Sequence, residues 1–290
     1  MTALAPAPAP EILSGAAAVA ARADWGRRLR QGGAVPYLGP GLLPPDAPVP
    51  TTPEALAGQF GARVALPRRA KGNAWAAAQH IESTRHRRTL SALMAEAFAA
   101  PVVPTAGHRG LAALGLPLIV DSWYDGAMRT ALTGRADWGE VQGITRAGPG
   151  EDQWYRFYDA GGARVDADAA AGWRTLLYKP HGSVVPAGNF LISDSDYVET
   201  LTEIDIQTPI PPEVRDRRQG RDFLFLGCRF HDQLLRSYAR QIGKRSGERP
   251  AALLDPEQLS RNEMRFLAGL GVTAISLPSD QALDVLFGAA

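Results

Sequence analysis

The chain has 290 residues with a formal net charge of +1, and 45% of them are hydrophobic and 21% charged. This composition is close to the globular average, so we expect one large fold. Nucleic acid is excluded as a partner because no basic stripe with interleaved aromatic residues occurs. No apolar run approaches the roughly 18 residues that span a bilayer. The single cysteine, Cys228, excludes a disulfide framework and a Cys₄ zinc ribbon, which favours the cytoplasm.

The first part of the chain predicts one strand and several helices. The Ala-Pro repeat over residues 1–10 predicts a flexible arm, because proline lacks an N–H donor and restricts the residue before it. Residues 11–31 predict an alanine-rich helix, and residues 34–38 a short buried strand. The proline-rich residues 40–53 predict a long loop over one end of the sheet. Three helical pieces of a small subdomain follow, at 74–81, 89–98 and 107–114.

The middle of the chain predicts a strand-turn-helix unit, with the strand at 117–120 and the helix at 126–132. Between residues 138 and 178, aromatic residues alternate with polar residues and glycines. This alternation predicts short strands or a hairpin, which we expect to be an excursion from the main sheet.

The final third alternates strands with helices. Residues 189–192 predict a strand, which a helix follows. Further strands are expected at 223–226, 251–254 and 272–275, with helices at 233–244 and 256–270. This alternation implies a Rossmann-like α/β fold with a mostly parallel sheet and helices on both faces. We expect a single domain over residues 11–290, with insertions at about 50–115 and 134–178.

Several polar and glycine residues directly follow the predicted strands. Gly39 and Gly41 follow the first strand, residues 121–125 the second, 193–196 a third, and Gly227 a fourth. Because ligands bind beyond the carboxyl ends of such strands, we expect these residues to line one crevice. The first two glycines either bring N–H groups near a phosphate or form a plain structural turn.

Histidine and arginine offer two further candidates for binding groups. His181 precedes Gly182 at the end of a strand-like segment, where it either acts as a general base or is hydrogen-bonded within a loop. Arg85, Arg87 and Arg88 either meet phosphate or form a solvated helix face, and we expect the solvated face. The other histidines have no metal-ligand spacing, so we expect no metal site; they are His80, His86, His108 and His231.

Four segments in order resemble the motifs of one family. They are 29–42 (LRQGGAVPYLGPGL), 121–125 (DSWYD), 179–183 (KPHGS) and 226–230 (LGCRF). Their order resembles the sirtuin-like family, particularly its divergent branch without a zinc module, over about residues 29–275. The resemblance implies NAD or ADP-ribose as ligand. It implies His181 as the base toward the nicotinamide ribose, Asp125 as its support, and a structural role for His108. The implied cofactor-binding residues are Gly39, Gly41, Ser122, Trp123, Tyr124, Gly182, Gly227 and Cys228.

One departure from the family pattern concerns the chemistry. Trp123 stands where the family carries an asparagine that holds the ribose and the reacting water. An indole donates one hydrogen bond and accepts none, so it does not replace a carboxamide. Loss of one positioned group of this kind costs about 10²- to 10³-fold in rate. Trp123 either stacks on a ligand ring or fills the pocket.

These features leave three functions open. The first expectation is a nucleotide-binding protein with a degenerate active site, which acts as a sensor or as an accessory subunit of a protein partner. The second is an NAD glycohydrolase or, less favoured, a deacylase that uses His181. The third is a ligand-free scaffold. Phosphoryl transfer is disfavoured because no P-loop run occurs. The oligomeric state stays open.

Overall fold

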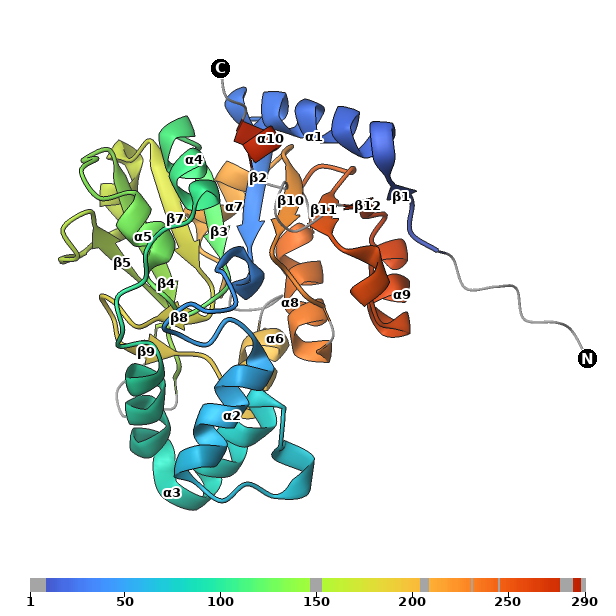
Figure 1. Ribbon diagram of the computed structural model, residues 1–290. Coiled ribbons are helices and arrows are strands. Elements are labelled where there is room, and N and C mark those ends of the chain that lie inside the picture. Colours follow the sequence, from blue (N-terminus) through green and yellow to red (C-terminus); the bar gives the residue numbers. More distant parts are fainter. Residues whose placement is uncertain are drawn as a thin grey trace, which may run out of the picture.

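The computed structural model describes residues 9–146, 153–203, 209–230, 232–244, 246–276 and 284–287, and these form one large sheet with helices on both faces (Figure 1). The strand order is β1-β12-β11-β10-β2-β3-β7-β4-β5-β6. These strands are β1 (Ile12–Leu13), β2 (Ala34–Leu38), β3 (Leu118–Asp121), β4 (Trp138–Gly143), β5 (Tyr155–Asp159), β6 (Arg164–Val165), β7 (Thr175–Lys179), β10 (Asp222–Leu226), β11 (Ala251–Leu254) and β12 (Thr273–Ser276). Within the described sheet, the antiparallel pairs are β4 with β5 and β5 with β6, so β5 alone runs against the direction of the other strands. The predicted fold class is confirmed.

The central strands are buried on both faces, as their apolar sequences require. In β2, Val35 and Tyr37 contribute to one hydrophobic cluster, and Ala34 and Leu38 contribute to another on the opposite face. This alternation follows from the two-residue period of a strand. Helices α1 (Gly15–Arg30), α4 (Ala106–Leu114), α5 (Ala127–Ala131) and α10 (Asp284–Phe287) pack on the face of Leu38. Helices α7 (Pro212–Arg218), α8 (Gln233–Gly243) and α9 (Arg261–Gly269) pack on the face of Tyr37.

A helical module lies beyond the end of β2 (Figure 1). It is built from α2 (Pro53–Arg63) and α3 (Ala74–Ala97), which share a third hydrophobic cluster. The two-stranded sheet of β8 (Gly182–Ser183) and β9 (Asn189–Phe190) and helix α6 (Asp194–Glu203) connect the module to the main sheet. Four short 3₁₀ helices complete the elements: η1 (Pro40–Leu42), η2 (Arg68–Ala70), η3 (Ala167–Gly172) and η4 (Pro256–Gln258).

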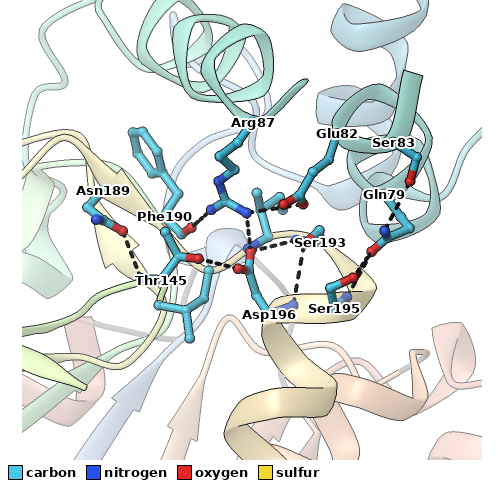
Figure 2. Close-up of polar contacts among 12 residues, drawn as sticks. Gln79, Glu82, Ser83, Arg87, Thr145, Asn189, Phe190, Ser193, Ser195 and Asp196 are labelled. Atoms are coloured by element: carbon cyan, nitrogen blue, oxygen red, sulfur yellow. Dashed lines mark hydrogen bonds and ion pairs between the residues drawn. The ribbon is translucent and has the colours of Figure 1, made fainter. Parts of the chain in front are cut away.

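Helix α3 replaces two of the predicted helical pieces and contains a kink. At His86 the backbone has φ 70° and ψ 154°, a conformation that only glycine adopts without strain. The chain therefore changes direction at His86. The following residue, Arg87, then points toward α6 (Figure 2).

Three sequence-based expectations about strands are wrong. Residues 138–178 are no excursion, since β7 pairs with both β3 and β4 inside the main sheet. The pattern of aromatic and polar residues predicts strands but not their partners. Ile12–Leu13 forms a strand beside β12 rather than helix. The strand predicted at 189–192 is present as β9, but it pairs with β8 in the small sheet and not with a strand of the main sheet.

Most other elements match their predicted positions. Strands β2 and β11 have the predicted bounds. Helices α4, α5 and α8 each begin and end within one residue of their own predicted bounds. Most of the expected arm, residues 1–8, lies outside the described residues. The division into one domain with insertions stays a prediction.

Candidate functional site

The glycine turn after β2 packs against the turn after β10. The N–H of Gly39 donates to the Leu226 carbonyl oxygen at 2.9 Å, and the N–H of Gly41 donates to that of Gly227 at 2.9 Å. A Cβ atom on Gly39 would lie 2.5 Å from the Gly227 oxygen. Gly227 itself has φ 64°, which favours glycine. The expected convergence of these glycines is present, and contact between the two turns requires them.

The backbone donors of this turn are all used within the protein. Besides Gly39 and Gly41, the N–H of Leu42 donates to the Gly39 carbonyl and that of Leu43 to the Pro40 carbonyl. Pro40 has no N–H. The geometry is that of a plain structural turn, in which no N–H of residues 39–43 points to a phosphate. A cofactor-binding role of these glycines stays a prediction.

Ser122 and Cys228 join the ends of neighbouring strands. The Ser122 hydroxyl donates to the Leu38 carbonyl oxygen at 2.7 Å. The Cys228 thiol lies 3.3 Å from the Tyr37 carbonyl oxygen. Burial raises the pKa of the Cys228 thiol, so the group stays protonated and is a poor nucleophile.

Trp123 lies in the core of the helical module. Its indole N–H donates to the Pro50 carbonyl oxygen at 2.7 Å, which ties the proline-rich loop to the module. The ring packs against Phe98 and Tyr124, with centroid distances of 5.9 and 5.1 Å. The Tyr124 hydroxyl donates to the Leu191 carbonyl oxygen at 2.8 Å. The Trp123 side chain therefore fills the interior of the module, and its one donor is already used.

Asp125 stabilises the start of α5. Its carboxylate accepts a hydrogen bond from the Ala127 N–H at 2.7 Å. Its carbonyl oxygen accepts one from the Lys179 ammonium at 2.8 Å, and Lys179 also pairs with Asp121 at 2.8 Å. This buried ion pair connects β3 to β7. The expected support of His181 by Asp125 stays a prediction.

His181 follows β7 and is buried, with 1% of its surface exposed. Its ring contacts Tyr197 of α6 and Tyr238 of α8, with centroid distances of 5.1 and 4.7 Å. Neither ring nitrogen has a hydrogen-bond partner. Burial, and to a smaller extent the charge of Lys179, lowers the pKa of His181 to about 3. The imidazole is therefore neutral at pH 7, with one donor and one acceptor unused.

The neighbouring Gly182 has a structural reason to be glycine. Its φ is 79°, and a Cβ atom there would collide with the Asn189 carbonyl oxygen across the small sheet. The close approach that the sequence predicts for a ligand is taken by the protein's own backbone.

Two further polar atoms near His181 lack partners. The indole N–H of Trp75 and the hydroxyl of Tyr197 are buried and unpaired. The Trp75 ring lies 6.5 Å from the Tyr197 ring, which contacts His181. We call Trp75, His181 and Tyr197 the polar aromatic cluster. Trp75 and Tyr197 belong to the hydrophobic cluster of the module. The Tyr238 ring, which His181 also contacts, belongs to the hydrophobic cluster on the Tyr37 face of the main sheet.

A network of polar contacts beside this cluster fixes α6 (Figure 2). The Asp196 carboxylate accepts hydrogen bonds from the Ile192 and Ser193 N–H groups at 2.9 and 3.0 Å and from the Thr145 hydroxyl. It also pairs with Arg87 at 2.7 Å. Arg87 in turn contacts Glu82 and donates to the Phe190 carbonyl oxygen. Only 17% of the Arg87 side chain is exposed, so the expected solvated face is wrong for this residue.

The comparison with protein families agrees with the geometry. The model of the SIR2-like domain family matches residues 117–275, which run from β3 to β12. The chain belongs to the SIR2-like family. A search of curated proteins finds no match. The matched part of the SIR2-like domain contains His181 and Tyr197, whereas Gly39 and Trp75 lie before it.

Among the described histidines of the SIR2-like chain, His108 has a structural role. His108 makes a capping box with Thr105 at the start of α4, and burial lowers its pKa to about 4. His231 lies outside the described residues. In the part of the chain that the structure describes, no group of three or more His, Cys, Asp or Glu side chains is placed to hold a metal ion. None of the described helices is long and apolar enough to cross a membrane.

Proposed function

We propose that this SIR2-like chain binds a nucleotide, NAD or ADP-ribose, and has weak or no catalytic activity. The observation that carries the proposal is the buried His181 ring, whose two nitrogens have no partner. Buried polar groups are nearly always hydrogen-bonded, and an exception calls for a missing partner. A ribose hydroxyl, which both donates and accepts, would satisfy a neutral imidazole.

Weak catalysis is proposed because the side chains near His181 and Trp123 are unsuited to breaking the nicotinamide bond of NAD. Trp123 occupies the asparagine position, and its N–H is bound to Pro50. His181, with a pKa of about 3, is a weak base at neutral pH. A sensor, or an accessory subunit of a protein partner in the cytoplasm, needs the binding site but not these groups.

A ligand-free scaffold is the second candidate. It is favoured by the glycine turn, whose N–H groups at Gly39 and Gly41 are already paired. The diphosphate of a nucleotide would then have to bind elsewhere or open this turn.

Calorimetric titration of the purified chain with NAD and with ADP-ribose tests the proposal. We expect measurable binding of at least one of them, without release of nicotinamide from NAD. Absence of binding to both would favour the scaffold. Nicotinamide release that disappears in the variant His181→Phe would favour the glycohydrolase.

A further inference from the structure

The polar aromatic cluster offers more hydrogen-bonding groups than His181 alone. Trp75 and Tyr197 are 2% and 1% exposed, and neither the indole N–H nor the phenol O–H is paired. Buried tryptophan and tyrosine side chains usually find a partner for their polar atom. Three neighbouring side chains with four unpaired atoms form a polar site inside an otherwise apolar junction.

The backbone on either side of the two donors is held in place by polar contacts. Tyr197 directly follows Asp196, whose carboxylate has partners on α3, on the turn before α6 and beyond β4 (Figure 2). Trp75 is the second residue of α3, and Asn73 caps that helix by accepting from the Ala76 N–H at 2.9 Å. The backbone positions of Trp75 and Tyr197 are therefore fixed by contacts of neighbouring residues.

The charges around the cluster favour an uncharged ligand group. Burial is the main cause that raises the pKa of Tyr197, and the carboxylates of Asp196 and Asp232 raise it further. Trp75 and Tyr124 approach the hydroxyl closely enough to lower this pKa, but neither meets hydrogen-bond geometry with it. Arg87, the cation of this network, is already paired with Asp196 and Glu82, so it is not available to an anionic oxygen. Because an indole N–H only donates, the ligand must supply an acceptor.

We propose that Trp75 and Tyr197 determine specificity by donating hydrogen bonds to an uncharged oxygen of the ligand that binds His181. This inference rests on the proposed function, because it requires a nucleotide at His181. Two ligand groups supply such an oxygen: the carboxamide of NAD and a hydroxyl of the terminal ribose, which NAD and ADP-ribose share.

The variants Trp75→Phe and Tyr197→Phe test the proposal, because each removes the polar atom and keeps an aromatic ring. The control is Trp138→Phe, since Trp138 is a second buried indole with an unpaired N–H and belongs to the hydrophobic cluster of Leu38, which contains neither Trp75 nor Tyr197. Calorimetry with NAD and ADP-ribose should show binding about 10-fold weaker for the first two variants, as expected for one lost hydrogen bond. Trp138→Phe should bind as the wild type does. Thermal melting without ligand verifies that each variant is folded.

The two ligands distinguish the two oxygens. Weaker binding of NAD alone assigns the carboxamide, and weaker binding of both ligands assigns the ribose hydroxyl. Wild-type affinity in both Trp75→Phe and Tyr197→Phe would overturn the inference and leave the proposed function intact. An equal loss in Trp138→Phe would also overturn it. If the wild type binds neither ligand, the proposed function and this inference fall together.

Discussion

His181 is held without charge by its surroundings. The rings of Tyr197 and Tyr238 enclose it, and Lys179 is the charged group that acts on it most. A protonated imidazole there would lack both water and a counter-ion. The same burial that makes His181 a weak base leaves its two nitrogens available to a neutral hydroxyl ligand.

This neutral state predicts a pH dependence of stability. The pKa of His181 is about 3 in the folded chain against 6.5 ordinarily, so the unfolded chain takes up this proton first as the pH falls. The free energy of unfolding therefore decreases between pH 6.5 and 3, by about 2 kcal/mol at pH 5. Urea denaturation at pH 7 and pH 5 gives the loss of unfolding free energy between the two pH values. This loss should be about 2 kcal/mol smaller in His181→Phe than in the wild type. Equal differences in the two proteins would show that His181 titrates normally.

Trp123 acts as a core residue, which predicts the effect of replacing it with asparagine. Trp123→Asn should destabilise the chain by about 3 kcal/mol or more, because it empties the space beside Phe98 and leaves the Pro50 carbonyl without its donor. Trp123→Phe, which retains a ring, should lose less. Chemical denaturation measures both, and an unchanged stability of Trp123→Asn would place the side chain outside the core.

At the scale of elements, the kink in α3 directs a charged residue into the protein. The strained backbone of His86 costs about 1–3 kcal/mol. It allows Arg87 to reach Asp196 and the Phe190 carbonyl (Figure 2). The network in turn positions α6, which carries Tyr197.

Three substitutions separate the strain from the ion pair. His86→Gly should be more stable than His86→Ala by about 1–2 kcal/mol, because glycine adopts this φ without strain. Arg87→Ala should cost about 3 kcal/mol, because the buried Asp196 carboxylate loses its charged partner. Urea denaturation at pH 7 measures all three. Equal stability of the glycine and alanine variants would mean that the helix straightens without cost.

The sequence predicts the elements that depend on local pattern. Strands β2 and β11 are short apolar runs with clear boundaries, so their residues alone identify them. The pairing of β7 with β3 and β4 was not predicted, because strand partners depend on contacts between distant segments. The convergence of Gly39 and Gly227 follows from the rule for carboxyl ends of parallel strands. Trp75 gave no sequence signal, since it meets Tyr197 only where α3 packs on α6.

At the scale of the whole molecule, the proposed site lies where two hydrophobic cores meet. His181 contacts Tyr238 from the core of the sheet and Tyr197 from the core of the module. A ligand at this junction would contact both parts, and its binding would stabilise the folded chain as a whole. In this SIR2-like chain the junction therefore contains a buried histidine whose two ring nitrogens are unpaired.

Calorimetric titration of NAD and of ADP-ribose into the wild type and into His181→Phe tests the central claim most directly. Phenylalanine preserves the ring contacts with Tyr197 and Tyr238 and removes both nitrogens, so the variant should fold. We expect the wild type to bind and the variant to bind at least about 10-fold more weakly. Equal affinity of the two proteins, or no binding by the wild type, would contradict a nucleotide site at His181.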